Sequence, residues 1–411
     1  MKTTSHSSSR SFKRKRLKTE KSSEDRISSL PDEIIHHIFS FMDMRDVVRT
    51  SILSNRWKTL WLSTSNLNFS FSLCSVCKEW DVVMLFDSQC DSCKKTRKSS
   101  MDFVDRVLMF RESCNIDKFN LFCTLEKLDG ARLHTWVLAA LKRNAQSLIL
   151  QLYGCFIPIE LPSKLFTSNS TVLKLLLNNS SGAPPAKLPN SICTSSRIKD
   201  LELKGVSFPN ANADGELILS CPVLENLCIT ECQLNNIKIF KISTPLLESL
   251  ECAYLYTRHY HSCQVNTCTP NLKRIMVKAR SFGVNSMLDY CLENLTSLAS
   301  AEVSFDSIDA PKKVWSKWLM KVLSGVHNVE SLKLTDRSFQ LLADFPESFK
   351  KLSDIFSNLK FVVLDKPGSL YAQAVLKHLF GNDIQWRLER GGVFTVGEKK
   401  MDGKTTFPEN I

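Results

Sequence analysis

No apolar run in this sequence of 411 residues approaches the roughly 18 residues that a membrane-spanning helix needs. The N-terminal residues also lack the apolar core of a secretory signal peptide. A GxxxxGKS/T phosphate loop, a GxSxG nucleophile elbow, an HExxH zinc motif and a GxGxxG nucleotide-binding loop are likewise absent. With only 13 glycines and 8 histidines, these absences predict a chain that neither enters a membrane nor carries enzymatic machinery.

Excess positive charge is scarce outside the N-terminus. The chain carries 54 Lys and Arg against 42 Asp and Glu, a formal charge of +12, and residues 1–26 contribute half of that surplus. A basic groove for nucleic acid through the folded body is therefore not expected. The hydrophobic fraction of 43% and the charged fraction of 23% are typical of a globular protein rather than a disordered one.

The first 24 residues are rich in Ser, Thr, Lys and Arg and hold few bulky apolar groups, so we expect them to be disordered. Within them Lys13, Arg14, Lys15 and Arg16 form a compact basic cluster of the nuclear-localisation type. A solvated polar tail and an organelle transit peptide are the alternatives. We expect the protein in the nucleus, in the cytoplasm or in both.

The 15 cysteines are odd in number and scattered. Because no leader for secretion precedes them, we expect a reducing compartment, no disulfides, and cysteines that act as small buried hydrophobic residues. One possible metal cluster is His259-x-His261-x-Cys263, with Cys268 beyond it. A polar loop is the alternative for this segment.

Two further cysteine pairs have the spacing of a zinc site. Cys74-x-x-Cys77 and Cys90-x-x-Cys93 are separated by twelve residues. Four thiolates in two paired turns can bind Zn²⁺ tetrahedrally. Surface or half-buried thiols without metal are the alternative, so zinc is a candidate and not a required cofactor.

Residues 25–61 read as three short helices. Apolar residues recur at helical spacing after Pro31, which suits the first turn of a helix. Asp46 can cap a second helix, and Trp57 and Trp61 lie four residues apart in a third. So short a bundle cannot enclose all its apolar groups in a private core. The excess predicts a docking partner, with a bundle packed only on its own chain as the alternative.

The same segment resembles an F-box, in the form found in plant F-box/leucine-rich-repeat proteins. The resemblance covers about 37 residues without a gap. Asn55 and residues 42–44 depart from the family pattern without disturbing the helical frame. The matching stretches are Asp25-Arg26-Ile27-Ser28, Leu30-Pro31-Asp32-Glu33-Ile34, Ile38-Phe39-Ser40-Phe41, Val48-Arg49-Thr50-Ser51-Ile52-Leu53-Ser54, Arg56-Trp57 and Leu60-Trp61.

An F-box implies docking on a Skp-family adaptor, which links the protein to a cullin scaffold. By resemblance, one group of residues would enter the adaptor groove: Leu30, Pro31, Ile34, Ile35, Ile38 and Phe39. A second group would be shared between that interface and the packing of the module: Val47, Val48, Ile52, Leu53 and Trp57. A patch of this size could bury ~800 Å² per partner.

An internal repeat runs from about residue 145 to residue 365. Its template is an apolar residue, two variable ones, a second apolar, one variable and a third apolar. Copies begin 23 to 31 residues apart, at Ala145, Val172, Ile198, Leu224, Leu247, Leu272, Leu298, Val329 and Leu359. Because leucine-rich repeats have periods of ~20–29 residues, we predict an α/β solenoid with a curved parallel sheet and an irregular or helical convex side. Ordinary α/β strands that share leucines are the alternative.

Residues that alternate with the apolar ladder of such a solenoid face its concave surface, where large partners bind. Their mixed charge suits a protein partner better than a phosphate backbone, although a solvated strand face is the alternative for each one. The candidate contact residues are Asp200, Glu202, Lys204, Asn226, Thr230, Arg274, Lys278 and Lys333.

Together these features predict the role of a non-catalytic receptor. The resemblance implies the substrate-recognition subunit of a Skp–cullin–F-box ubiquitin ligase, which holds an unidentified target protein. The alternatives are an adaptor-binding scaffold without a substrate and a nuclear nucleic-acid binder that uses the basic tail. The predicted segments are a tail (1–24), an F-box (25–65), a linker leading into the repeats (66–144), leucine-rich repeats (145–365) and a C-terminal cap (366–411).

Overall fold

The computed structural model describes most of the predicted module and repeats. The described residues are 27, 29–71, 91–112, 114–124, 130–155, 159–179, 185–257, 262–280, 288–306, 311–346, 356, 358–365, 369–380, 386–389 and 393–396. Several predicted sites lie outside them: the basic cluster 13–16, Cys74, Cys77, Cys90, His259 and His261. For Cys93 the backbone is described and the side chain is not. The nuclear-localisation and zinc sites therefore stay predictions.

The N-terminal helical module (residues 29–63) consists of short helices. They are α1 (Asp32–Phe39), α2 (Met44–Arg49), η1 (Thr50–Ile52), α3 (Trp57–Leu60) and η2 (Trp61–Ser63). The prediction that Asp46 caps the second helix is wrong. The carboxylate of Asp43 accepts a hydrogen bond of 2.8 Å from the backbone amide of Arg45, so α2 begins one turn earlier.

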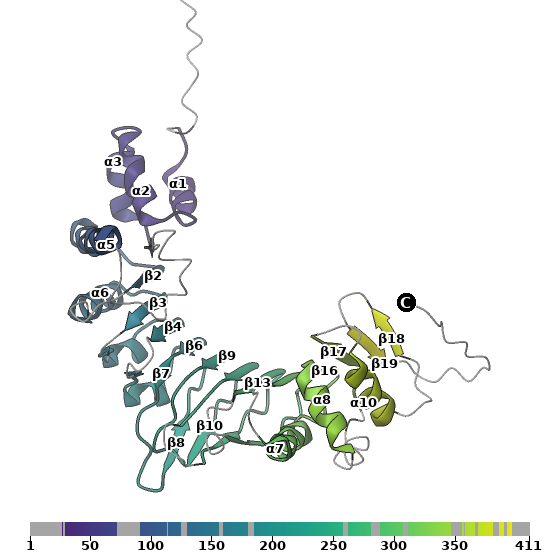
Figure 1. Cartoon of the computed structure of the whole chain (residues 1–411). Coiled ribbons are helices and arrows are strands. Elements are labelled where there is room, and N and C mark those ends of the chain that lie inside the picture. Colours follow the sequence, from purple (N-terminus) through teal and green to yellow (C-terminus); the bar gives the residue numbers. More distant parts are fainter. Residues whose placement is uncertain are drawn as a thin grey trace, which may run out of the picture.

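Eleven parallel strands line the inner side of an arc (Figure 1). They are β1 (Asn66–Ser70), β2 (Lys118–Thr124), β3 (Ser147–Cys155), β4 (Val172–Asn179), β6 (Asp200–Lys204), β9 (Asn226–Thr230), β11 (Ser249–Ala253), β13 (Arg274–Arg280), β15 (Ser300–Asp306), β16 (Ser331–Leu334) and β17 (Phe361–Leu364). Two antiparallel strands, β19 (Val393–Val396) and β18 (Trp386–Glu389), continue this main sheet beyond β17.

Alternation along each strand divides the sheet into a buried and an open face. In β6, Leu201 and Leu203 are buried, and the three polar residues between and beside them are half-exposed on the opposite face. The second and third apolar positions of all nine predicted repeats are buried, including those of the weaker copies. The predicted solenoid is thus confirmed, because stacked neighbours close one continuous apolar core.

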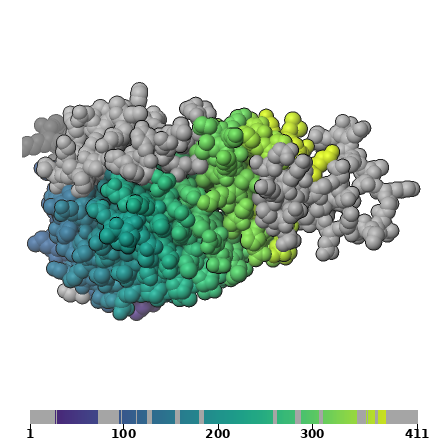
Figure 2. All heavy atoms as spheres, turned by 90° about the horizontal axis from the view of Figure 1, so that it is seen from below, coloured from purple at the N-terminus to yellow at the C-terminus, as the bar shows by residue number. Residues whose placement is uncertain are grey.

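The chain returns on the outer side of the arc through helices and short strands. Helices α5 (Asp91–Phe110), α6 (Gly130–Lys142) and α7 (Lys312–Gly325) lie there (Figure 1). The remaining elements are η5 (Ser163–Phe166), η6 (Asn190–Thr194), α8 (Asp336–Asp344), α10 (Leu370–Phe380), the parallel sheet of β14 (Asp289–Leu292), β12 (Gln264–Thr267), β10 (Ile239–Ile242) and β8 (Glu216–Leu219), and the pair β5 (Ala186–Lys187) and β7 (Val206–Ser207). Seen from below, the repeats follow one another in chain order along one body (Figure 2). None of the described helices combines the length and the hydropathy of a membrane span.

The main sheet starts before the first repeat that the sequence pattern identifies. Asn66 in β1 pairs with Lys118 in β2, which in turn pairs with Ser147 in β3. The segment between β1 and β2 includes the long helix α5. A search for a regular period therefore does not find these two strands, although they continue the same parallel register.

Candidate functional site

Exposed apolar side chains concentrate on the N-terminal helical module and the residues just before it. Fourteen large hydrophobic residues are exposed in the described part of the chain, and six of them lie between residues 27 and 53. We call these six the apolar face: Ile27, Ile34, Ile38, Phe41, Ile52 and Leu53. Ile52 is 87% exposed and Phe41 76%. So dense a set of exposed apolar groups is typical of a docking surface.

The eleven predicted adaptor-contact residues separate into three sets. Exposed are Pro31, Ile34, Ile38, Ile52 and Leu53, and half-buried are Leu30 and Val48. Fully or almost fully buried are Ile35, Phe39, Val47 and Trp57. The buried set forms the core of the module and supports the apolar face from behind. Sequence reasoning did not select Ile27 and Phe41, although Phe41 continues the helical spacing three residues after Ile38.

The module is fixed to the first strand and to α5 by polar contacts. A carboxylate oxygen of Asp43 accepts a hydrogen bond of 2.7 Å from the backbone amide of Ser70 in β1. Arg45 donates to the hydroxyl of Ser100 in α5. Its guanidinium also lies 4.8 Å from the ring centroid of Phe71. These contacts hold the apolar face in one orientation relative to the solenoid.

A buried arginine completes this junction. Arg111, only 4% exposed, donates a hydrogen bond of 2.7 Å to the carbonyl of Thr64 at the end of the module. It also contacts the sulfur of Cys114 at 3.0 Å. Burial lowers the pKa of Arg111 from its ordinary value. A guanidinium remains protonated nevertheless, so the carbonyl contact provides part of the compensation for its buried charge.

On the open face of the main sheet, the predicted partner-contact residues pair with one another and with their neighbours. Lys174 donates to Glu202 at 2.6 Å and Asn226 to Asp200 at 2.5 Å, each across adjacent strands. Lys204 lies 3.6 Å from the carboxylate of Glu231, beyond β9. Thr230 lies beside Cys228, with 3.6 Å between Oγ1 and Sγ. The predicted residues are therefore brought together on one face.

Further along the sheet one carboxylate serves two lysines. Glu302 lies 3.2 Å from Lys278 and 3.1 Å from Lys333, and its side chain is 18% exposed. Sequence reasoning selected both lysines and missed this glutamate, although it occupies the equivalent position in the weaker repeat at Leu298. Arg274 is exposed and has no ion pair or side-chain hydrogen bond with any residue that the structure describes.

The thiols of the solenoid behave as core groups. Burial raises the pKa of Cys193 and Cys221 to about 11, and that of Cys263 to about 12. Cys268 is exposed. Within the described ranges, no three His, Cys, Asp or Glu residues form a group that could hold a metal ion. Neither predicted metal cluster is described completely, so this finding does not test them.

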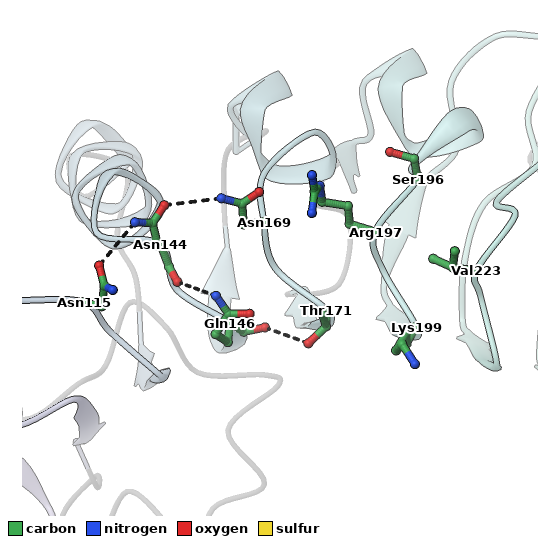
Figure 3. Close-up of a pocket in the computed structure, with 9 residues that line it drawn as sticks. All are labelled: Asn115, Asn144, Gln146, Asn169, Thr171, Ser196, Arg197, Lys199 and Val223. Atoms are coloured by element: carbon green, nitrogen blue, oxygen red, sulfur yellow. Dashed lines mark hydrogen bonds between the residues drawn. The ribbon is translucent and has the colours of Figure 1, made fainter.

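A hollow of about 680 Å³ lies at the edge where the parallel strands begin (Figure 3). Its lining residues are Asn115, Asn144, Gln146, Asn169, Thr171, Ser196, Arg197, Lys199 and Val223. The three asparagines form a chain of amides, since Asn144 donates to Asn115 at 3.2 Å and Asn169 to Asn144 at 3.4 Å. We call this hollow the edge groove. Sequence reasoning did not identify it.

Comparison with known proteins agrees with the fold. Residues 27–69 match the F-box domain family. The chain is 28% identical over 338 residues to F-box/LRR-repeat protein At3g59200 of Arabidopsis thaliana, with 78% of this chain and 61% of that protein covered. It is 30% identical over 303 residues to F-box protein At4g09920 of the same plant, covering 73% of this chain and 87% of the relative. A similar match, 28% over 303 residues, covers 66% of the FBD-associated F-box protein At4g10400. The chain therefore belongs to the F-box protein family and joins its F-box to a leucine-rich-repeat solenoid.

Proposed function

We propose that this protein is the substrate-recognition subunit of a Skp–cullin–F-box ubiquitin ligase. The single observation that supports the adaptor contact is the apolar face, six exposed hydrophobic residues on the short module that matches the F-box family. Each such side chain gains about 1.5–3 kcal/mol when it moves fully from water into an apolar contact. A Skp-family adaptor is the partner that an F-box implies.

The exposure of the predicted residues narrows the proposed contact. Pro31, Ile34, Ile38, Ile52 and Leu53 would contact the adaptor directly, with Leu30 and Val48 at the margin. The buried set has no free surface to offer. We assign Ile35, Phe39, Val47 and Trp57 the role of holding the apolar face in shape.

The solenoid would hold the target protein. Its open sheet face carries the polar residues from Asp200 to Lys333, most of them paired and Arg274 unpaired among the described residues, which suits a folded partner of mixed charge. Family members are typically non-catalytic components, and this proposal needs no catalytic residue here. By binding adaptor and target together, the chain raises the effective concentration of target lysines near the activated ubiquitin.

The test is co-purification of the full chain with a Skp-family adaptor and a cullin. We expect both to be retained by the wild type and lost by the double variant Ile34→Asp and Ile38→Asp. Ile218→Asp, at a comparably exposed isoleucine in β8, is the matched control and should retain both. Circular dichroism verifies that all variants are folded.

Three outcomes distinguish the possibilities. Loss of adaptor only in the double variant supports the proposed contact. Adaptor without cullin in the wild type indicates a scaffold outside the ligase. Adaptor retained by the folded double variant, or absent from the wild type, would contradict the assignment.

A further inference from the structure

The edge groove contains a break in a repeated row of asparagines. Ten strands of the main sheet lie from β2 to β17, and the position three residues before the strand is Asn in six of them. Each of these amides except the first bonds back to the preceding repeat; Asn271, for example, donates to the carbonyl of Pro245 at 2.8 Å. This row of asparagines therefore links neighbouring repeats by hydrogen bonds along the edge. The exceptions are Arg197, Val223, Leu246 and Ser297.

Three of the exceptions, Arg197, Val223 and Leu246, precede neighbouring strands of the main sheet. At this point the row of asparagine hydrogen bonds stops. The guanidinium of Arg197 reaches toward Asn169 in the neighbouring repeat (Figure 3), yet it forms no hydrogen bond or ion pair with any described residue. Asn169 uses its amide nitrogen on Asn144, and no described residue donates to its side-chain oxygen. Val223 lines the groove and is half-buried. Leu246 occupies the same position in the next repeat, outside the groove lining, and is 47% exposed.

Three lysines along this edge are neutralised. Lys199, Lys273 and Lys360 each occupy the position directly before a strand. They pair with a glutamate of an adjacent repeat at 2.7, 2.7 and 3.0 Å. The hydrogen bond to Glu225 also raises the pKa of Lys199 from its ordinary value. No acidic residue lines the groove, so Arg197 is its unpaired charge.

We infer that the edge groove and the adjoining Leu246 bind an extended peptide segment of a target protein, with a carboxylate on Arg197 and an apolar side chain on Val223 and Leu246. The inference rests on the proposed function for the origin of the peptide. A guanidinium recognises a carboxylate through two parallel hydrogen bonds, and the free amide oxygen of Asn169 can accept from a peptide N–H.

The distance between Arg197 and Leu246 sets the spacing of the two recognised residues in the peptide. Arg197 and Leu246 precede strands separated by one intervening strand, so they lie on the order of 10 Å apart. A peptide in the extended polyproline II conformation has three residues per turn and rises about 3.1 Å per residue, so side chains three positions apart share one face and are separated by about 9 Å. The expected motif is an acidic residue followed, three positions along, by Leu, Ile, Val or Phe.

The test is selection of a random twelve-residue peptide library on the full chain without adaptor, at low and at physiological salt. Selected peptides are then synthesised, and their affinities are measured by fluorescence anisotropy. Arg197→Gln and Leu246→Ser are the test variants. Lys187→Gln, which removes one exposed charge in β5, and Ile218→Ser, which removes a comparably exposed apolar group, are the controls.

We expect enrichment of the acidic-x-x-apolar motif, and at least fivefold weaker binding to Arg197→Gln than to Lys187→Gln. Replacing the acidic residue of the peptide by its amide should weaken binding equally. The inference would be overturned if the library showed no enrichment of the motif, or if a phosphorylated peptide bound better than the carboxylate peptide. It would also be overturned if Arg197→Gln left the affinity unchanged, as is expected when the basic tail binds the peptide. Because adaptor is absent, any of these results leaves the proposed function untouched.

Discussion

The rings of Phe39 and Trp57 meet edge to face, with 5.7 Å between their centroids. Both side chains are buried, and they join α1 to α3 behind the apolar face. The opposite side of α1 exposes Ile34 and Ile38. One helix of eight residues therefore contributes both to the core of the F-box and to its exposed apolar face, and we expect the two contributions to be separable by mutation.

Phe39→Ala should reduce the free energy of unfolding of the F-box by about 3–5 kcal/mol, because it leaves a cavity against Trp57. Ile52→Ala should change stability by less than ~0.5 kcal/mol, since this side chain contacts mainly water. Both should weaken adaptor binding. Thermal denaturation combined with calorimetric titration of the adaptor measures the two effects. Full stability of Phe39→Ala, or unchanged adaptor affinity of Ile52→Ala, would count against the division of roles.

Glu302→Gln should destabilise the solenoid by roughly 0.5–1.5 kcal/mol, because two lysines lose their shared, partly buried acceptor. The matched change Glu225→Gln, in a more exposed pair with Lys199, should cost less than about 0.5 kcal/mol. Urea denaturation at two salt concentrations measures both. Equal losses of unfolding free energy in the two variants would show that sharing one carboxylate between two lysines adds no stability.

Asn144 has a φ of +57° and belongs to the row of hydrogen-bonded asparagines in the edge groove. Asn144→Ala should cost about 1–2 kcal/mol, because Ala tolerates this φ less well than Asn does and the amide bonds are lost. Asn144→Gly removes the same bonds without the strain. It should therefore be the more stable of the two variants by roughly 1 kcal/mol. Differential scanning calorimetry compares them, and an alanine variant as stable as the glycine variant would contradict this account.

Alkaline pH should weaken the solenoid through its buried thiols. Burial raises the pKa of Cys193, Cys221 and Cys228 to about 11, and of Cys232 and Cys263 to about 12. In the unfolded chain a thiol ionises near 9.0. Above that pH the unfolded state binds fewer protons than the folded state, so stability falls as pH rises.

Between the unfolded value near 9.0 and the folded values of about 11 to 12, the slope should approach about 1.4 kcal/mol per pH unit for each such thiol. Urea denaturation under reducing conditions at pH 8.0, 9.0 and 10.0 measures how the slope sets in. Replacing Cys193 and Cys228 by Ala should make the slope shallower. A pH slope that the double replacement leaves unchanged would assign the effect to other groups.

The repeat pattern predicted the solenoid correctly because burial alternates with every second residue of a strand. The weak copy at Leu247 ends in Cys252 rather than a leucine, and Cys252 is nevertheless buried beside Leu250. A small apolar side chain at the right spacing is enough for its place in the ladder. The strands β1 and β2 escaped prediction because α5 lies between them and removes the period.

The orientation of individual side chains in the F-box could not be read from spacing alone. Ile34 and Ile35 are adjacent and chemically identical, yet Ile35 is fully buried and Ile34 is 47% exposed. Which of the two faces the core depends on where α3 places Trp57, which is a tertiary contact. The same limit applies to Phe41, whose exposure depends on the turn after α1.

The F-box, the repeat period and the alternation of buried and open positions could all be predicted from the chain, because these depend on residues close together in it. Which charges meet depends on how the repeats stack. Glu302 reaches two lysines from different repeats, and Arg197 lacks the glutamate that Lys199 has in Glu225. The physical reason is that stacking brings together residues about one repeat apart, and a pattern within one repeat carries no information about its neighbours.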